Sequence, residues 1–304
     1  MSETRCGFVA LIGAPNAGKS TLINALVGEK VSIVTRKAQT TRSTVRGVLT
    51  TGEAQIVFVD TPGLFAPKRR LDRAMVASAW AAAADADVLA LLIDARKEAG
   101  QSAVTEETQA ILKSLGESRK PKLLVLNKVD LVARPKLLEL AARVNAALRF
   151  DDTFMISAAT GDGLDRLTGR LIELMPPGPW LYPEDQIAEA PMRSLAAEIT
   201  REKLIERLHD ELPYQATVET DSWKDLPDGS ARIEQTIFVT RESHRKIVLG
   251  EGGRAIKAIG TAARKDIAEA HGANVHLFLH VKVREHWLDD PERYRAMGLE
   301  FPKG

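Results

Sequence analysis

The sequence has almost no cysteine: Cys6 is the only one among 304 residues. A single thiol cannot form a disulfide within the chain, and this composition is typical of proteins from a reducing compartment. The six histidines are scattered and have no cysteine partners at the spacing of zinc ligands. The composition therefore excludes a disulfide scaffold and a cysteine–histidine zinc site.

An uninterrupted apolar run long enough to cross a membrane is also missing. The most apolar stretch, residues 74–94, is divided by Asp85 and Asp87, which predicts an alanine-rich helix followed by a strand at 88–93. The first predicted strand begins within a few residues of Met1, which leaves no room for a signal peptide. We therefore expect a cytoplasmic protein, and its length predicts two domains.

A phosphate-binding loop lies near the start of the chain. It fits the pattern G-x-x-x-x-G-K-[ST], follows a predicted strand at 8–12 and precedes a predicted helix at 21–27. Its backbone N–H groups surround the β-phosphate, Lys19 brings a charge to the β- and γ-phosphates, and Ser20 ligates Mg²⁺. The predicted nucleotide-binding residues here are Gly13, Ala14, Pro15, Asn16, Ala17, Gly18, Lys19, Ser20 and Thr21.

Two later motifs choose guanine as the base. Asn127-Lys128-Val129-Asp130 follows a predicted strand at 122–126, and the Asp130 carboxylate can accept both hydrogens of guanine N1–H and N2–H₂. Adenine has neither hydrogen at that edge, so it would leave the carboxylate unpaired. Asn127 is expected to orient the loop and the Lys128 stem to lie over the base. Ser157, Ala158 and Ala159 follow a strand at 153–156, and their backbone can contact guanine O6.

A carboxylate between these motifs is expected to bind the metal. Asp60, Thr61, Pro62 and Gly63 follow a predicted strand at 54–59. Asp60 is placed to hold Mg²⁺ through a water, and the Gly63 N–H can reach the γ-phosphate and sense its loss. The next residue is Leu64, where many small GTPases place a water-orienting glutamine. We therefore expect slow hydrolysis of GTP.

The second half of the chain has a different pattern. Up to about residue 176, strands and helices alternate, with one hairpin around Gly52, which predicts a mostly parallel α/β sheet covered by helices. Residues 177–190, with four prolines in the stretch 176–183, predict a semi-rigid linker. Residues 191–304 then follow the order α-β-β-α-α-β, beginning with one long helix at 192–212 and including helices at 244–249 and 254–270.

A glycine-rich turn in this second domain predicts an RNA-binding site. Residues 248–257 resemble the V-I-G-x-x-G-x-x-I-K signature of KH domains, and the element order is that of the type II form. The turn lets the backbone approach about four nucleotides of single-stranded RNA. Residues 241–266 carry seven Lys or Arg against three Asp or Glu, and Ile247, Val248 and Ile256 would line the groove for the bases. The predicted RNA-binding residues are Arg245, Lys246, Gly250, Gly252, Gly253, Arg254 and Lys257.

Taken together, these motifs resemble the Era family of bacterial ribosome-assembly GTPases over nearly the whole chain, including 198–204 and 211–214. The resemblance implies a Ras-like P-loop GTPase domain at 1–176, a linker at 177–190 and an α+β type II KH domain at 191–304. It also implies a monomer that takes GTP and GDP, binds the 3′ end of small-subunit ribosomal RNA and assists 30S subunit assembly. Members of the family are also found at the inner membrane face, so a peripheral membrane association follows by resemblance alone.

The resemblance also assigns roles in the reaction. The family's magnesium threonine lies in the segment 39–42; we favour Thr41, and Thr40 stays open. The metal ligands are then Ser20, Thr41 and Asp60, and the catalytic groups are Lys19, Thr41, Gly63 and Asn16. Related enzymes with asparagine at the Asn16 position use it to hold K⁺ near the β–γ bridge, and a simple loop role for Asn16 is the alternative.

Two other functions remain open from the sequence. One is a GTPase of another RNA or tRNA-modification pathway, whose C-terminal domain docks a protein partner. Such an enzyme would need a catalytic cysteine or a cofactor site outside the first domain, and the sequence offers none. The other is an RNA-binding scaffold with a degenerate nucleotide site, against which Lys19, Ser20, Asp60 and Asp130 argue.

Overall fold

The computed structural model describes residues 4–35, 37, 40–188, 192–208 and 212–302. Gln39 and Glu211, which belong to the segments 39–42 and 211–214 of the sequence analysis, lie outside these ranges. The chain divides into two compact units. The first comprises Met1–Ser32, Thr41–Glu189 and Met297–Gly304, and the second comprises Ile33–Thr40 and Ala190–Ala296. The division near residue 190 falls at the end of the predicted linker, but each unit also takes one segment from the other's predicted range.

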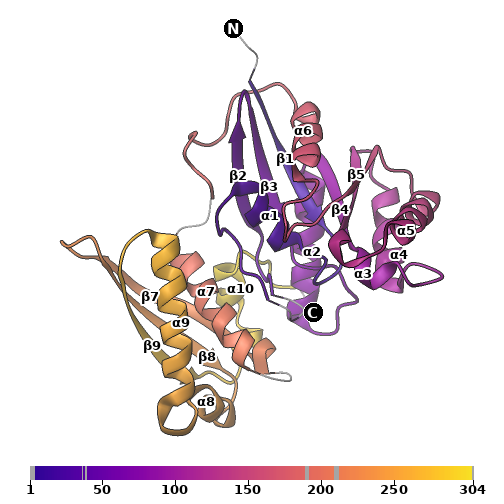
Figure 1. Cartoon of the computed structure of the whole chain (residues 1–304). Helices are drawn as coiled ribbons and strands as arrows, with labels where there is room; N and C mark the ends of the chain where they lie inside the picture. Colours follow the sequence, from indigo (N-terminus) through magenta and orange to yellow (C-terminus); the bar gives the residue numbers. More distant parts are fainter. Residues whose placement is uncertain (1–3, 36, 38–39, 189–191, 209–211, 303–304) are drawn as a thin grey trace. The chain divides into compact units, whose positions relative to one another are not determined.

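The first unit is built on a six-stranded sheet (Figure 1). The strand order is β2-β3-β1-β4-β5-β6, in which β2 and β3 form an antiparallel hairpin and the other pairs are parallel. The strands are β1 Arg5–Ile12, β2 Val45–Thr51, β3 Ala54–Asp60, β4 Val88–Asp94, β5 Lys122–Asn127 and β6 Asp152–Met155. This order confirms the mostly parallel sheet and the hairpin turn at Gly52.

Helices cover both faces of this sheet because successive strand residues point to opposite sides. Val9 and Leu11 pack in one core cluster, and Ala10 and Ile12 pack in the other. Helices α1 Lys19–Val27 and α6 Leu164–Leu174 contribute to the first cluster, and α2 Arg70–Asp85, α4 Glu106–Gly116 and α5 Arg134–Ala147 to the second. The short helix α3 Ala95–Glu98, which sequence periodicity did not predict, follows β4.

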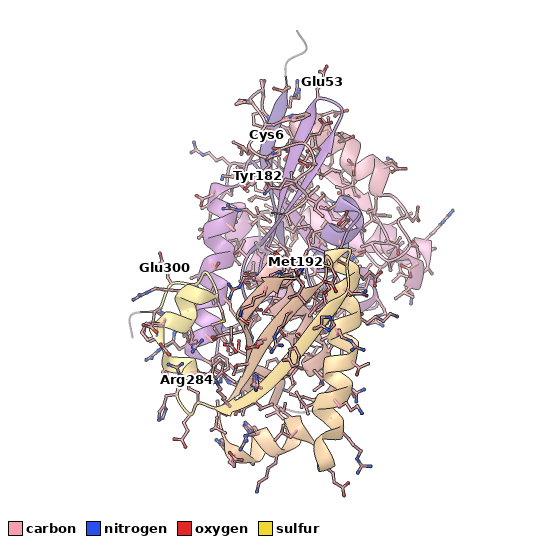
Figure 2. The ribbon with its side chains drawn as sticks, turned by 90° about the vertical axis from the view of Figure 1, so that its left-hand side faces the viewer. Cys6, Glu53, Tyr182, Met192, Arg284 and Glu300 are labelled. Atoms are coloured by element: carbon pink, nitrogen blue, oxygen red, sulfur yellow. The ribbon has the colours of Figure 1, made fainter. Side chains whose placement is uncertain are left out.

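The proline-rich segment after α6 is bonded along the first unit. Gln55, which is fully buried, accepts hydrogen bonds from the backbone N–H groups of Leu181 and Tyr182 at 2.9 and 3.0 Å. The Trp180 indole donates to the Glu53 carbonyl at 3.2 Å. Figure 2 shows the labelled residues Cys6, Glu53 and Tyr182 at the same end of this unit. The segment predicted as a linker is therefore held to strand β3 by side-chain and backbone bonds.

The second unit has a three-stranded sheet of order β7-β8-β9. Strands β7 Ala216–Asp225 and β8 Ala231–Val239 are antiparallel, and β9 Val275–Val283 runs parallel to β8. The helices are α7 Met192–Arg207, α8 Glu242–Leu249, α9 Arg254–His271 and the unpredicted α10 Pro291–Ala296. The predicted helix at 192–212 was too long, because α7 ends at Arg207. Leu212–Gln215 form a separate 3₁₀ turn, and its Pro213 has no N–H with which to continue a helix. Among the described residues, no helix is long and apolar enough to pass through a bilayer.

Candidate functional site

The phosphate loop joins β1 to α1, as its sequence predicts. Lys19 begins α1 and is only 6% exposed, and its ammonium donates to the carbonyls of Gly13 at 2.9 Å and Ala14 at 3.1 Å. Burial lowers the pKa of Lys19 to about 8, and the nearby Asp60 carboxylate opposes this shift. The loop therefore holds a desolvated cation where a triphosphate can replace the two carbonyls as its partner.

A carboxylate and three hydroxyl groups gather beside Lys19. The fully buried Asp60 accepts hydrogen bonds through Oδ2 from Ser20 Oγ at 2.7 Å and Ser32 Oγ at 2.8 Å. Its other oxygen, Oδ1, is buried and has no partner among the described residues. Burial raises the pKa of Asp60, against bonds from Ser20, Ser32 and Thr41 and the Lys19 charge.

This oxygen-only cluster fits Mg²⁺. Hard divalent ions take oxygen ligands, and Mg²⁺ is usually bound by one or two carboxylates together with waters and substrate phosphates. Within the described ranges, no three His, Cys, Asp or Glu side chains converge as an all-protein metal site. Asp60 and Ser20 can therefore supply part of a magnesium ligand set that nucleotide phosphates would complete, and a cation beside the buried Oδ1 atom would offset the cost of its desolvation.

The structure separates the two candidate threonines. Thr41 Oγ1 lies 3.0 Å from Ser20 Oγ and bonds Asp60, so it faces the metal cluster. Thr40 Oγ1 lies 2.6 Å from Thr35 Oγ1 and donates to the Lys37 carbonyl at 2.8 Å. The geometry thus favours Thr41 as the metal ligand.

The segment after β3 approaches the phosphate loop closely. A Cβ on Gly63 would lie 2.8 Å from the backbone of Pro15, so only glycine fits this contact. The Leu64 N–H donates to the Gly13 carbonyl at 3.0 Å, and its side chain, 3% exposed, lies in the core cluster of α2, α4 and α5. Leu64 therefore points away from the nucleotide side, as expected of a hydrophobic residue at this position.

Asn127 connects the three loops that surround the base. Its amide donates to the Ala17 carbonyl at 2.9 Å, and its Oδ1 accepts from the N–H groups of Lys128 at 2.8 Å and Ala158 at 3.0 Å. The side chain is 2% exposed, so these bonds are shielded from water. A single buried amide thus fixes the phosphate loop, the N-K-x-D loop and the S-A-A loop relative to one another.

Lys128 and Asp130 present their side chains differently. Lys128 adopts a left-handed backbone, and its ammonium lies 2.6 Å from both the Asn16 carbonyl and Asp94 Oδ2. Asp130 lies in the 3₁₀ turn Val129–Leu131 and is exposed, and its carboxylate makes no hydrogen bond within the described part of the chain. The carboxylate chosen to read guanine is therefore free for a ligand.

The remaining residues predicted to contact the nucleotide lie in or next to the same loops. Thr61 is fully buried and donates to the Leu11 carbonyl at 2.7 Å, so it supports the loop from behind. Ala159 is exposed, and Ser157 is buried with its N–H on the Asp162 carbonyl at 3.0 Å. The predicted residues that surround these positions are Gly13, Ala14, Pro15, Asn16, Ala17, Gly18, Thr21, Pro62 and Ala158.

Two supporting residues were missed by the sequence analysis. Ser32 bonds Asp60 from a segment with no motif of its own, and Asp94 holds Lys128 from the end of β4. Asp94 Oδ1 also accepts from the N–H groups of Arg96 and Lys97, so it caps α3. Its place at the carboxyl end of a strand was the only available signal, because such ends bind ligands in parallel sheets.

The second unit carries the predicted glycine turn between α8 and α9. Gly250, Gly252 and Gly253 have φ angles of 70°, 58° and 75°, which residues other than glycine rarely adopt. Gly253 is the N-cap of the 18-residue helix α9, and its side-chain-free turn leaves backbone N–H groups at the helix start. The turn is thus shaped for close contact with a sugar–phosphate backbone.

Basic side chains surround this turn. Lys246, Arg254 and Lys257 are exposed and Arg245 is half-buried. Arg254 pairs with Glu251 and Arg245 with Glu242, but each of the four side chains is at least 44% exposed, and such pairs contribute little in water. These partners can exchange for phosphate oxygens at small cost.

The groove beside the turn differs from its prediction at one residue. Val248 is fully buried in the core with Leu204 and Val239, so it cannot contact a base. The helical period of α8 points Val248 inward and turns Ile247, which is 56% exposed, toward solvent. Ile256 is partly buried against the same core.

Residues 8–128 match the family described as 50S ribosome-binding GTPase, and residues 211–288 match the KH domain family. The chain is 64% identical over 300 residues to GTPase Era from Afipia carboxidovorans, covering 99% of this chain and 96% of that protein. It is 62% identical over 301 residues to GTPase Era from Brucella suis, covering 99% and 95%.

Solved structures agree over both units. A crystal structure of Era in complex with MgGDPNP and nucleotides 1506–1542 of 16S ribosomal RNA matches with a TM-score of 0.90 and 36% identity, covering 97% of this chain and 99% of that one. A variant of Era from Aquifex aeolicus bound to GDP and AlF₄⁻ matches with a TM-score of 0.88 and 37% identity over the same shares.

Proposed function

The chain belongs to the Era family of GTPases, and from this premise we propose that it is a nucleotide switch for small-subunit ribosomal RNA. It is a GTPase of the P-loop fold with a C-terminal KH domain. In the proposed function it binds the single-stranded 3′ end of that RNA when GTP is bound, assists maturation of the 30S subunit, and releases after hydrolysis. One observation supports this most: a GTP site with its Lys19 and Asp60 in place shares a chain with an exposed glycine turn bordered by Lys246 and Lys257.

The relative bound to MgGDPNP and 16S ribosomal RNA supports the RNA partner, because it matches both units. The chemistry of the second unit agrees with such a partner. Exposed cations attract the phosphate backbone, and the positive φ angles at Gly250 and Gly253 allow it to come close. We infer that bases then enter beside Ile247 and Ile256.

Hydrolysis in this site rests on positioning and charge. Lys19 would exchange its two carbonyl partners for β- and γ-phosphate oxygens, and the Gly63 N–H would donate to the γ-phosphate. Ser20, Thr41 and Asp60 would hold Mg²⁺, which when bound would neutralise part of the negative charge of the phosphates. Leu64 cannot orient a water, so turnover without a further activator is expected to be slow.

The first test is RNA binding in both nucleotide states. We expect a labelled single strand from the 3′ end of small-subunit rRNA to bind at least about tenfold more tightly with a GTP analogue than with GDP. Gly253→Asp should remove this binding, because it places a side chain and a negative charge at a left-handed position beside phosphate. Gly298→Asp, at φ 67° outside the turn, is the matched control.

The outcomes of this test separate the alternatives. Equal RNA affinity with both nucleotides would remove the switch, since a ligand with equal affinity for two states shifts neither. Absence of RNA binding in either state would leave the GTPase in place and move the KH domain to docking of a protein partner.

We also propose that Asn16 holds K⁺ during hydrolysis. Two observations support this proposal: Asn16 lies in the phosphate loop, and it is exposed with a backbone φ of 63°. Asparagine tolerates this left-handed backbone, so the residue also has a purely structural explanation. Glycine keeps the backbone and removes the side-chain oxygen, which separates the two roles.

GTP turnover in KCl should exceed turnover in NaCl by about tenfold or more, since the cation supplies charge that an arginine finger supplies elsewhere. Asn16→Gly should turn over GTP equally slowly in both salts and keep its GDP affinity. Stimulation by K⁺ that survives Asn16→Gly would assign the ion to other ligands. The other expectations from the family, a cytoplasmic monomer with a peripheral inner-membrane association, stay predictions.

A further inference from the structure

A segment that precedes the metal threonine is packed into the second unit. Residues Ile33–Thr40 belong to that unit, whereas Thr41 belongs to the first. Ile33 is 2% exposed and lies in a core cluster with Ile199 of α7 and Ile233 of β8. Apolar burial thus fixes the start of this segment, as it fixes the sheet beneath it.

The side chain of Glu202 on α7 fixes the next residue. Its Oε1 accepts a hydrogen bond from the Val34 N–H at 2.7 Å, although the residue is only 3% exposed. Lys203 lies 3.2 Å from Glu202 Oε2 and 2.6 Å from Asp266 Oδ2 of α9. A buried carboxylate needs such compensation, so the bond to Val34 is one part of a satisfied ionic network.

Arg201 fixes the end of the segment. Its guanidinium is 1% exposed, donates through Nη2 to the Thr40 carbonyl and pairs with Glu198, with Nε 2.8 Å from Glu198 Oε1. Nη1 is buried without a partner among the described residues. Burying an incompletely bonded guanidinium is costly, and a hydrophobic side chain of similar volume would often stabilise the fold more. Its presence is therefore better explained by a role in function than by stability.

We propose that Arg201 and Glu202 are positioning residues for GTP hydrolysis. They hold the backbone of Val34 and Thr40 to α7. This restricts the backbone next to Thr41 and so keeps the Thr41 hydroxyl beside Ser20 and Asp60. This inference rests on the proposed metal role of Thr41. In this proposal, the affinity for GTP relative to GDP depends on two side chains of the second unit that are not nucleotide ligands.

The test compares affinities for a GTP analogue and for GDP, both with Mg²⁺, in the full chain. Thr41 would be ordered by the metal that the γ-phosphate holds, so we expect GDP binding not to depend on Thr41. Arg201→Met should lower the ratio of GTP-analogue affinity to GDP affinity by about 10–100-fold. It should also raise the Mg²⁺ concentration at half-maximal turnover, and change GDP affinity by less than about twofold. Arg201→Lys should recover part of the ratio, since it keeps one charged donor.

Matched controls lie on the same helix. Arg207→Met removes an exposed arginine of α7, and Glu206→Gln removes a carboxylate that is 49% exposed; both should keep the wild-type ratio. Thr41→Ala is the reference and should show the same loss as Arg201→Met. If Thr41→Ala leaves the ratio unchanged while Arg201→Met lowers it, Arg201 does not act through Thr41, and both the metal role of Thr41 and the positioning inference that rests on it fail.

An unchanged ratio in Arg201→Met would overturn the inference. If Arg201→Met loses affinity for both nucleotides together, the substitution has damaged the fold, and Glu202→Ala decides by the same ratio. Glu202→Ala removes the acceptor of the Val34 N–H together with one ion-pair partner of Lys203, whereas Glu202→Gln removes the charge but keeps an oxygen acceptor for Val34. A lower ratio in the alanine variant, recovered in the glutamine variant, supports the inference, and an unchanged ratio in both contradicts it.

Discussion

Replacing Asp130 by asparagine is expected to lower the affinity for GTP by about 10³-fold and to allow XTP to bind in its place. The exposed Asp130 carboxylate can accept both N1–H and N2–H₂ of guanine. Hydrogen bonds to a charged group contribute about 1.5–3 kcal/mol each, and 1.4 kcal/mol is a tenfold change in affinity. The asparagine amide instead directs a donor at the N2–H₂ group, where xanthine carries an oxygen that accepts it.

The measurement is competition of GTP, XTP and ATP against a fluorescent guanine nucleotide, or against its xanthine counterpart for the variant. Asp165→Asn is the matched control, because it removes an exposed carboxylate in the first turn of α6 and should leave all three affinities unchanged. Equal losses for GTP and XTP would mean that Asp130 supports the loop rather than reading the base.

Replacing Lys19 by methionine is expected to abolish turnover and yet stabilise the nucleotide-free protein. Turnover should fall by at least about 10³-fold, since one charge-stabilising donor in an active site is worth about 10²–10³ and Lys19 would contact two phosphates in the proposed mechanism. Stability should rise because the wild-type chain buries a lysine whose pKa falls to about 8. The Gly13 and Ala14 carbonyls keep the N–H groups of Leu64 and Ala17 as partners after the ammonium is gone.

The pH dependence identifies this cause. The ordinary pKa of lysine is 10.5, so between pH 8 and 10.5 the unfolded chain holds a proton that the folded protein has released. The contribution of Lys19 to stability therefore rises with pH across that window, and the full cost of the buried charge is present below pH 8. We expect Lys19→Met to be more stable than wild type by about 1–2 kcal/mol at pH 7, because the relief of the buried charge is partly offset by the loss of the ammonium hydrogen bonds to the Gly13 and Ala14 carbonyls. The difference in free energy of unfolding between the variant and the wild type should become smaller toward pH 10.5.

Urea unfolding of both proteins, stripped of nucleotide with EDTA, measures this difference at pH 7 and 9.5. Lys113→Met, which removes an exposed lysine in the last turn of α4, should show no such gap at either pH. A methionine variant that is less stable at pH 7, or a gap that does not change with pH, would contradict the burial argument.

The motifs predicted the place of the nucleotide site because each one directly follows an apolar run that itself predicts a strand. The six parallel and hairpin strands and the loops at Lys19, Asp60 and Asn127 were therefore predictable from the sequence. The short helices α3 and α10 were not, since four and six residues are too few to show a helical period. The end of α7 was missed because its apolar pattern runs on beyond Arg207 toward Leu212.

Side chains that act across the fold were the other omission. Ser32, Asp94 and Arg201 belong to no motif, and their partners lie 28, 34 and 161 positions away in sequence. Only the three-dimensional arrangement brings Ser32 to Asp60 or Arg201 to Thr40. The same holds for Val248 and Ile247: the pattern marked both as apolar, and the orientation of α8 decided which one faces the core.

The division of the chain into units has a consequence for how it is cut. Between Ser32 and Met297 the polypeptide passes from one unit to the other four times, at 32/33, 40/41, 189/190 and 296/297. A fragment that stops at residue 176 would lose the backbone partners that Gln55 and Val48 find at Leu181 and Ile187. A fragment that starts at 190 would lack Ile33 from its interior. No single scission, by a protease or at a cloning boundary, separates the two units with each one whole.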